Sequence, residues 1–379
     1  MYFCPDIAVA GRVWALMGLL ILHGSLALAQ ETSTDRRPGI APDIREDDTD
    51  LKLQRGDFVI VPIPISNPTL DSGLVAGAAY FYPQTEEQKK LQPASVTAAA
   101  AMYTSNDSRA FAVVQQNYWN DNKWRFTGAA GWTDLRLSLL APDQTAGGLA
   151  LDWRINGKFL FAKIGRKLQG DWYGGIFSRI IDARQSLVFN EDASGFDIGS
   201  DVRASGLGVS LEYDSRDMPL NSYSGRHFKL DALFNDEEID SNSTYQSYSA
   251  AYRSYHPVTD SLVLAWELQG CQRSGTAPLW DACTVKLRGF SATDYLGKKS
   301  ASGQAEARWK LNKRWGLVGF AGTGYVANSF SGIRDREAIP SYGVGVRFMV
   351  LKAKRINLRL DYARSTDSDA IHFSVGEAF

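Results

Sequence analysis

Histidine is the side chain best suited to acid–base chemistry near neutral pH, and this sequence contains four histidines. They are His23, His227, His256 and His372. A covalent hydrolase such as a phospholipase needs a nucleophile held against such a base. The sequence has no Gly-x-Ser-x-Gly segment and no serine–histidine spacing that indicates such a pair. We therefore predict that the protein is not an enzyme and needs no cofactor.

Two of the three cysteines are placed to form a disulfide. Cys4 precedes the apolar run near the N-terminus, in a segment that we expect to be removed on export. Cys271 and Cys283 then remain, and an exported pair favours a disulfide over free thiols. Closing so short a loop contributes roughly 2–3 kcal/mol in a chain-entropy model. A zinc or CxxC redox site is excluded by the spacing and by the lack of a nearby histidine cluster.

An acidic stretch offers the best alternative for a metal. It runs from Asn190-Glu191-Asp192 to Asp197 and Asp201. Carboxylate oxygens are ligands that calcium prefers, but acidic surface loops are commonly only solvated. We predict a solvated loop and no metal site.

The N-terminal residues are typical of an export signal. Arg12 precedes an apolar run at residues 13–22, which is too short to cross a bilayer, and Ala27-Leu28-Ala29 matches the small-x-small cleavage pattern. We expect residues 1–29 to be a cleaved signal peptide, with an uncleaved anchor as the alternative. Residues 30–55 are polar and acidic without apolar periodicity, which predicts a disordered periplasmic tail. The net charge of −1 gives no indication of nucleic-acid binding.

Residues 56–379 show a hydrophobic period of two rather than a helical period. In residues 304–311, for example, Ala305, Ala307 and Trp309 alternate with Gln304, Glu306 and Arg308. Sixteen such segments can be delimited, at residues 57–66, 71–83, 93–105, 108–120, 122–136, 153–167, 171–185, 203–215, 225–236, 244–256, 261–271, 302–312, 315–328, 340–350, 354–363 and 370–379. A soluble sandwich would also alternate. The strand length, the charged and glycine-rich polar faces and the final aromatic residue favour an all-β transmembrane antiparallel barrel with a wet interior.

The lengths of the connections predict the orientation of this barrel. With the N-terminus in the periplasm, connections after odd-numbered strands face outward and should be long, and those after even-numbered strands should be short. The segments at 137–152, 186–202 and 272–301 fit as outward loops. The turns near 84–92 and 216–224 are longer than expected for the periplasmic side.

Several motifs, in their order and spacing, resemble the bacterial surface antigen family that includes BamA and TamA. A strand–turn motif has Asp214, Arg216, Asp217 and Gly225, although the family's proline before the glycine is missing. Leu287-Arg288-Gly289-Phe290 resembles the motif of the family's sixth extracellular loop, and Ala305-Glu306-Ala307-Arg308 resembles its acidic wall strand. Gly322 stands where the family has an aspartate, and the ending through Gly376 to Phe379 resembles the closing strand.

This resemblance implies a bacterial outer-membrane barrel with an inward-folded extracellular loop. It implies that Arg288 pairs with an acidic residue of the inner wall, and strand alternation points Glu306 inward. A guanidinium binds a carboxylate with two hydrogen bonds, so the pair would fix where the loop rests. The alternative is an exposed loop arginine. Because Gly322 replaces the aspartate, we expect the second acidic partner to be absent.

Pro62 and Pro64 lie two residues apart in the first predicted strand. Residues i and i+2 present their N–H groups to the same neighbour, and proline has none. If that neighbour is the last strand, the seam that closes the barrel is weak. The alternative is that residues 57–66 are a periplasmic lead-in or a plug.

The leading functional hypothesis is a barrel that helps to insert or translocate protein, or moves lipid, by opening at this seam. The alternative is a passive or structural pore. The family's assembly proteins carry periplasmic POTRA domains, and residues 30–55 are too few for one. We therefore expect a monomeric barrel in contact with outer-membrane lipids, served by a separate periplasmic protein in place of POTRA domains.

Overall fold

The computed structural model describes residues 58–140, 150–189, 196–218, 221–291, 293–330, 332, 337–352, 355–366 and 368–379. The predicted signal peptide and the predicted periplasmic tail lie outside the described residues, and so does the part of the acidic stretch at residues 190–195. Among the described helices, none is long and apolar enough to cross a membrane.

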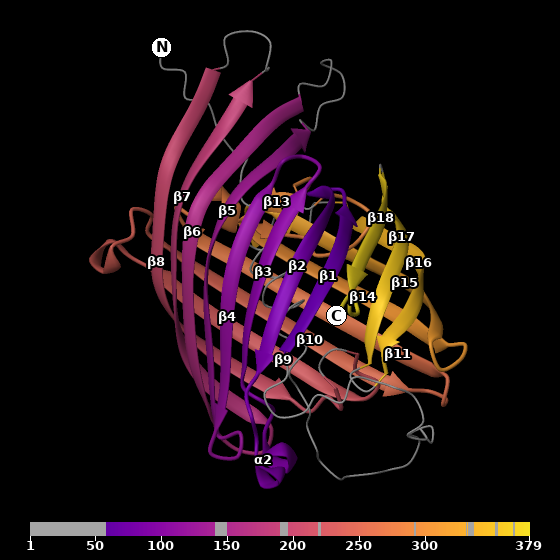
Figure 1. Cartoon of the computed structure of the whole chain (residues 1–379). Helices are drawn as coiled ribbons and strands as arrows, with labels where there is room; N and C mark the ends of the chain where they lie inside the picture. Colours follow the sequence, from indigo (N-terminus) through magenta and orange to yellow (C-terminus); the bar gives the residue numbers. More distant parts are fainter. Residues whose placement is uncertain are drawn as a thin grey trace.

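Sixteen antiparallel strands form one closed barrel, in which the first strand lies beside the last (Figure 1). They are β1 (Phe58–Asn67), β2 (Asp71–Phe81), β3 (Val96–Thr104), β4 (Arg109–Trp119), β5 (Trp124–Leu140), β6 (Ala150–Lys167), β7 (Trp172–Phe189), β8 (Phe196–Asp214), β9 (Gly225–Asn235), β10 (Tyr245–Pro257), β11 (Leu262–Gly275), β14 (Lys299–Lys310), β15 (Trp315–Ala327), β16 (Ile339–Leu351), β17 (Ile356–Arg364) and β18 (Asp369–Val375). The predicted fold class and strand number are confirmed. Two further short strands, β12 (Cys283–Thr284) and β13 (Leu296–Gly297), pair with each other in the loop between β11 and β14.

Four consecutive strands are longer than the sequence predicted. Strands β5 to β8 have 17 to 19 residues, whereas β2 to β4 have 9 to 11. Figure 1 shows these four strands extending beyond their neighbours at one end. Their outer positions there are charged, as at Asp182, Arg184 and Asp201. The apolar/polar alternation that marks a lipid-facing strand is therefore lost before the strand ends.

The interior of the barrel has an apolar side and a charged side. On one side, Leu135 of β5 and Trp153 and Ile155 of β6 are inward, apolar and completely buried. Charged inward groups occur on β7 and β8 as well, at Arg179 and Glu212. Inward side chains of β9 to β18 include many charged groups, such as Glu267 on β11 and Arg347 on β16. The prediction of a polar inner face is therefore wrong for this apolar cluster, because its side chains pack against one another and against Trp280 of the loop that enters the barrel.

A short helix, α2 (Glu86–Leu91), occupies the long turn between β2 and β3. Thr85 accepts a hydrogen bond from the Gln88 amide, and the Gln88 side chain accepts one from the Thr85 amide. This capping box starts a helix too short to show a hydrophobic period, so the sequence analysis missed it.

Candidate functional site: the inward loop and the barrel seam

The loop between β11 and β14, residues 276–298, enters the barrel. It carries a short 3-10 helix, η4 (Leu279–Asp281), followed by β12, the Leu287-Arg288-Gly289-Phe290 motif and β13. Phe290 and Val285 pack with Ile339 of β16 in a buried apolar cluster, which Leu287 flanks. The loop is therefore packed against the inner wall, as the family resemblance implied.

Arg288 is held by two carboxylates and an aromatic ring. Its Nη2 donates to Glu306 Oε1 at 2.5 Å, and its Nη1 donates to Asp361 Oδ2 at 2.7 Å. Its guanidinium carbon lies 3.4 Å from the centre of the Phe320 ring. Arg288 is 6% exposed, Glu306 2% and Asp361 0%. The structure thus brings Arg288 and Glu306 together, and the loop arginine is not exposed.

The expectation that a second acidic partner is absent is wrong, because Asp361 of β17 supplies it. Gly322 leaves room only for hydrogen, since a Cβ there would lie 2.8 Å from the Gln304 side chain. Strand alternation in residues 356–363 already pointed Asp361 inward. No sequence signal indicated that this carboxylate, rather than one on β15, would meet Arg288.

Each of the two carboxylates also pairs with an arginine of the wall. Glu306 Oε2 accepts from Arg308 Nε at 2.8 Å, and Asp361 pairs with Arg347. Removing Arg288 would therefore leave Glu306 with Arg308, and Asp361 with Arg347 and Arg359.

Gly289 of the motif and Ser291 just after it contact the two sides of the junction between the first and last strands. The Gly289 amide donates to His372 Nε2 of β18 at 3.3 Å, and Ser368 Oγ donates to the Gly289 carbonyl at 2.8 Å. Ser291 Oγ lies 3.2 Å from Thr69 Oγ1 in the turn between β1 and β2. Gly289 has a φ of +103° and lies against the Arg364 backbone, which favours glycine at this position.

A second anchor, which the sequence analysis missed, holds the loop on the opposite wall. Asp281 accepts from Arg179 of β7 at 2.6 Å, from Arg273 of β11 at 3.0 Å and from the Tyr245 hydroxyl of β10 at 2.8 Å. The neighbouring Trp280 is 0% exposed in the apolar side of the interior. Burial alone would raise the pKa of Asp281, but attraction by Arg179 and Arg273 holds it well below its usual range. Asp281 is therefore ionised at neutral pH.

The predicted disulfide between Cys271 and Cys283 is present and ties the loop to β11. The two Cα atoms are 5.6 Å apart, a normal separation for a disulfide.

Replacing Cys271 and Cys283 together by serine should lower the free energy of unfolding by about 2–3 kcal/mol, because the unfolded chain loses its cross-link. Urea unfolding in vesicles, followed by tryptophan fluorescence, measures this change. Adding a reductant should shift the wild-type midpoint by a similar amount and leave the serine variant unmoved. Equal midpoints for oxidised wild type and the serine variant would contradict the prediction.

The strand–turn motif organises the long turn after β8. Asp214 binds Arg216 through both oxygens, at 2.8 and 2.7 Å. Asp217 accepts from the Tyr223 amide at 3.0 Å and from Arg355, in the turn after β16, at 2.5 Å. Gly225 has a φ of +98°, and a Cβ there would lie 2.2 Å from the Ser215 carbonyl oxygen. The turn between β8 and β9 is therefore fastened to the turn between β16 and β17, which accounts for its length.

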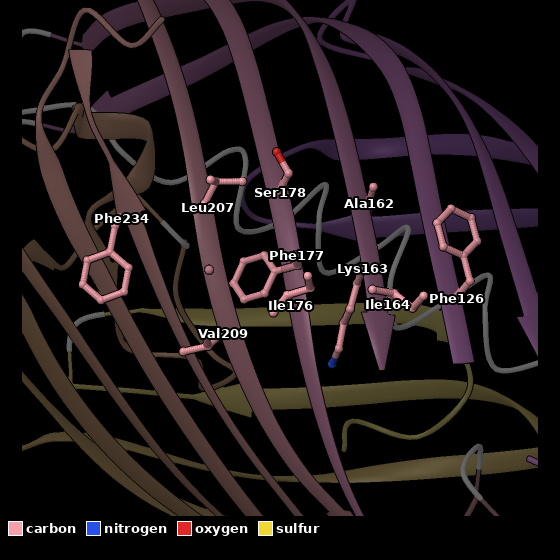
Figure 2. A pocket seen from close by; sticks show the side chains of 11 residues that line it. Phe126, Ala162, Lys163, Ile164, Ile176, Phe177, Ser178, Leu207, Val209 and Phe234 are labelled. Atoms are coloured by element: carbon pink, nitrogen blue, oxygen red, sulfur yellow. The ribbon is translucent and has the colours of Figure 1, made fainter. Parts of the chain in front are cut away.

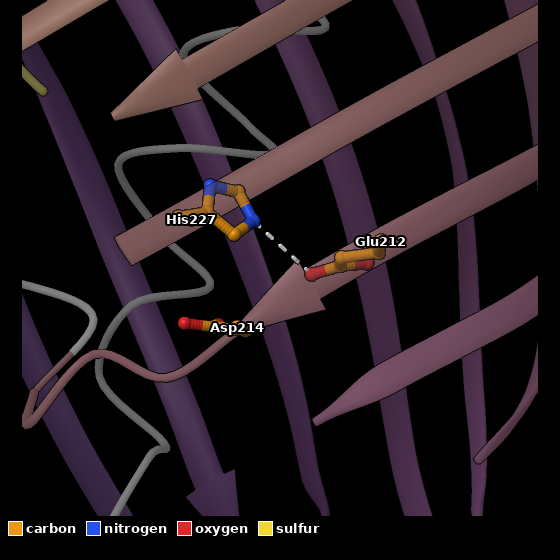
Figure 3. A group of neighbouring side chains, drawn as sticks. All are labelled: Glu212, Asp214 and His227. Atoms are coloured by element: carbon orange, nitrogen blue, oxygen red, sulfur yellow. Dashed lines mark hydrogen bonds and ion pairs between the residues drawn. The ribbon is translucent and has the colours of Figure 1, made fainter. Parts of the chain in front are cut away.

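One group of side chains among the described residues has ligand types that suit a metal, namely Glu212, Asp214 and His227 (Figure 3). Glu212 binds His227 Nε2 at 3.2 Å and Lys163 at 3.4 Å. Both Asp214 oxygens bind Arg216. Because two cations already neutralise the two carboxylates, a metal ion would have to displace them, and we assign no metal site here.

The seam between β1 and β18 consists of one residue pair, Ser66 with Phe373. By contrast, β1 pairs with β2 through ten residues. The Ser72 carbonyl accepts from Ser105 beyond β3, so Ser72 faces β3. Its partner Ser66 therefore faces β18, and so do Pro64 and Pro62, at intervals of two.

Prolines therefore flank the only pair of this seam. Pro64 would oppose Val375 if the register of Ser66 with Phe373 continued, and it has no N–H to donate. Pro68, two residues beyond Ser66 and already in the turn, also lacks a donor. Ser66 is the one residue on this side of the chain between Pro62 and Pro68 that can donate to β18.

Replacing Pro62 and Pro64 together by valine should lengthen the seam and stabilise the barrel by about 1 kcal/mol for each hydrogen bond gained. Amide hydrogen exchange at Phe373 and Val375 should slow, and the urea midpoint should rise. The matched control is Pro83→Val, an exposed proline beyond β2, which should change neither. Unchanged exchange in β18 would contradict the prediction.

The predicted closing strand, 370–379, is too long. Strand β18 ends at Val375, and the chain turns inward at Gly376. Glu377 then pairs with Arg347 at 2.8 Å, and the Phe379 main-chain oxygen accepts from Arg308 at 2.9 Å. Inward arginines therefore draw the last residues off the strand, although their apolar pattern would also fit a strand.

The outer surface is apolar, as a lipid-facing wall requires. Ile176, Leu207 and Val209 are more than half exposed on β7 and β8. Together with Phe126 and Phe234 they border a shallow apolar groove over Ala162, Ser178 and Gly208 (Figure 2).

Comparison with known proteins places this barrel in a family. The model of the Omp85 superfamily domain matches residues 189–379. No curated protein matches the sequence. Among solved structures, BamA from Haemophilus ducreyi lacking POTRA domains 1–3 is similar, with a TM-score of 0.57 and 11% identity over 85% of this chain and 70% of that chain.

CdiB from Acinetobacter baumannii has a TM-score of 0.57 and 12% identity over 86% of this chain and 60% of its own. CdiB from Escherichia coli has a TM-score of 0.58 and 10% identity, over 86% of this chain and 63% of its own chain. At such identities the likeness shows a shared fold, and the chain spans 60% to 70% of the lengths of these three proteins. The match of the family model to residues 189–379, half of the sequence, shows that this outer-membrane barrel belongs to the Omp85 superfamily.

Proposed function

We propose that this barrel passes protein segments or lipid between its interior and the bilayer by opening between β1 and β18. The observation that carries the proposal is the single pair Ser66–Phe373, whereas every other junction between neighbouring strands of the barrel has at least seven pairs among the described residues. The hydrogen bonds that must break to part β1 from β18 are therefore few, each worth about 1 kcal/mol net.

The inward loop supports a controlled opening. Its residues contact both sides of the seam, through Gly289 with His372 on β18 and through Ser291 with Thr69 beside β1. Arg288, Asp281 and the disulfide hold the loop in this position. The loop therefore closes the seam from inside while it is seated, and its movement would free both edges.

A disulfide across the seam tests the proposal. In an antiparallel hydrogen-bonded pair the Cα atoms are about 5.5 Å apart, within the range of a disulfide. Ser66→Cys combined with Phe373→Cys should therefore lock the seam when oxidised. Vesicles containing the protein offer two readouts. One is the folding rate of a second, dye-labelled, urea-unfolded copy of the barrel, and the other is extraction of a fluorescent phospholipid by albumin.

Oxidation should abolish whichever rate the wild-type barrel accelerates, and reduction should restore it. All proteins in this experiment carry serine at positions 271 and 283, so that oxidation and reduction act only on the seam. Ser66→Cys alone serves as the control and should respond to neither treatment. The second candidate function is a passive or structural pore. It would be favoured if the barrel accelerates neither folding of the second copy nor extraction of the phospholipid, or if the oxidised and reduced barrels give the same rate.

This proposal assigns client capture to a separate periplasmic protein that contacts the barrel at its turns. The periplasmic rim exposes single apolar side chains suited to such a contact, including Leu91 on α2 and Leu168 in the turn after β6. A photo-reactive residue at position 91 should crosslink to that protein in native outer membranes. The same group at Leu268, an exposed residue of β11, should crosslink to lipid alone.

A further inference from the structure

Lys286 is a cation without an ion pair inside the barrel. It lies in the inward loop, between Val285 and the Leu287-Arg288-Gly289-Phe290 motif. Val285 is 2% exposed and packs with Ile339 of the inner wall. Lys286 itself is only partly exposed, makes no hydrogen bond or ion pair with any described residue, and keeps its ammonium group in contact with solvent. Lysine is rarely taken out of water without a partner, so an anion at this position would be stabilised.

Glu267 of β11, the carboxylate that attracts Lys286 most strongly, is already occupied. Its Oε1 accepts from Arg253 Nε at 2.7 Å, and its Oε2 accepts from Gln304 Nε2 at 2.8 Å. Glu267 is 2% exposed, and Arg253 neutralises its charge. Lys286 is therefore left without a counter-ion of its own.

The other charges that act strongly on Lys286 are cations, namely Arg273, Arg253 and Lys229. The loop up to Lys286 and the inner faces of β7, β9, β10 and β11 carry five cations and three carboxylates, which we call the lumenal cluster: Arg179, Lys229, Arg253, Arg273, Lys286, Asp231, Glu267 and Asp281. Each carboxylate pairs with at least one cation of the cluster. Two positive charges of the cluster therefore remain without a negative one.

The carboxylates of the flanking strands do not supply the missing charge. Glu212 of β8 binds Lys163 at 3.4 Å, and Glu306 of β14 binds Arg288 at 2.5 Å. Burial, together with the cations of the lumenal cluster, lowers the pKa of Lys286 to about 8. The ammonium group is therefore mostly charged at pH 7 and mostly neutral at about pH 9.

We propose that Lys286 is the centre of an anion-binding site inside the barrel, and that its ligand is inorganic phosphate or a phosphate monoester. The two surplus charges of the lumenal cluster match a phosphate group, which carries about −1.5 to −2 charges at pH 7. A lysine binds phosphate as a point charge and needs no fixed orientation of the ligand. A monovalent anion such as acetate would neutralise only one of the two charges. The site lies within the closed barrel, so this inference does not depend on opening between β1 and β18.

Pyridoxal phosphate is the probe that tests the site, because it joins a phosphate monoester to an aldehyde. The aldehyde condenses with a lysine amine to an imine and releases water, and borohydride then reduces the imine to a stable secondary amine. Mass spectrometry of the full-length protein in phosphatidylcholine vesicles measures the labelled fraction of each lysine. Lys313, an exposed residue in the turn between β14 and β15, is the internal control.

Labelling of Lys286 should saturate with probe concentration, and inorganic phosphate should reduce it at least about tenfold at pH 7. Acetate at the same ionic strength should protect Lys286 far less, and phosphate should not protect Lys313. Protection by phosphate should weaken at about pH 9, where Lys286 is mostly neutral. If Lys286 is not labelled, or if its labelling neither saturates nor responds to phosphate, the site does not exist. Equal protection by acetate would overturn the assignment of phosphate as the ligand.

Two variants test the surplus charge. Lys229→Gln removes one positive charge from the lumenal cluster and should weaken protection of Lys286 by phosphate several-fold. Lys229→Gln combined with Asp231→Asn removes a cation and its carboxylate together, so it should restore protection. Equal protection in the single and the double variant would contradict the charge argument. Repeating the labelling in vesicles that contain phosphatidic acid distinguishes the two sources of a phosphate monoester, because a lipid headgroup would protect Lys286 without added phosphate and a soluble ligand would not be replaced by the lipid.

Discussion

Replacing Asp281 by alanine is expected to lower the free energy of unfolding by about 5 kcal/mol, the upper end of the range for breaking a buried ion pair. Arg179 and Arg273 would lose their shared carboxylate, and Tyr245 would lose its acceptor. Two partly buried guanidinium groups, whose side chains are 21% and 10% exposed, would then have no neutralising partner in this anchor. The measurement is urea unfolding in vesicles at pH 7.

Two further variants make this prediction specific. Asp281→Asn keeps the shape and an acceptor for Tyr245, so a loss close to that of alanine would show that charge dominates. Asp240→Ala removes an exposed partner of Arg203, whose side chains are 72% and 43% exposed, and should cost no more than about 1 kcal/mol. If Asp281→Ala costs no more than Asp240→Ala, the second anchor does not hold the loop.

The stabilisation by Asp281 has a defined pH dependence. Its pKa is lowered in the folded protein, so the stabilisation is fully present above the unfolded pKa of about 3.9. It is lost only as the pH falls through the lower folded value. The difference in stability between wild type and Asp281→Asn should therefore be constant from pH 7 to pH 5.

Replacing Arg288 by alanine is expected to cost about 3 kcal/mol, the lower end of the same range. Arg308 and Arg347 would still neutralise Glu306 and Asp361, so neither carboxylate would be left without a cation. The more informative change is in conductance. With the motif no longer fixed to β14 and β17, single channels in planar bilayers should become larger or noisier.

Arg184→Ala is the matched control, because this arginine forms a 3.3 Å pair in which both side chains are at least 60% exposed. It should leave both the stability and the current unchanged. If Arg288→Ala gives the same current as wild type, the motif does not restrict the interior, and the passive or structural pore becomes the better account.

The barrel was predictable because its strands repeat one simple pattern. Each strand has lipid on one side and the interior of the barrel on the other, so apolar and polar residues alternate along it. A segment such as residues 304–311 therefore shows from the sequence both that it is a strand and which side chains point inward. The pattern failed where that environment ends. The outer positions of β5 to β8 beyond the apolar band are charged, and the residues after Val375 satisfy inward arginines rather than a neighbouring strand.

The contacts inside the barrel were less predictable than the strands. The alternation of apolar and polar residues places the side chains of Glu306 and Asp361 inside the barrel. It does not show which inward side chains contact one another, because that depends on how a long loop crosses the interior. The family motif identified Arg288. Trp280 and Asp281 match no motif, and only the closed barrel shows that Arg179, more than one hundred residues earlier, lies beside Asp281.

The loop that spans the seam also orders the assembly of the molecule. Residues 276–298 are synthesised before β14 to β18, but their binding sites on Asp361, Ser368 and His372 exist only after the last strands have formed. The contact of Ser291 with Thr69 further requires that β1 and β18 have already met, across more than three hundred residues of chain. Pairing between such distant segments is slow, because the entropy of closing the ring is lost before any contact compensates for it. We therefore expect Arg288 and Gly289 to reach their final positions late in folding, and protection of the Gly289 amide from hydrogen exchange should report that the barrel has closed.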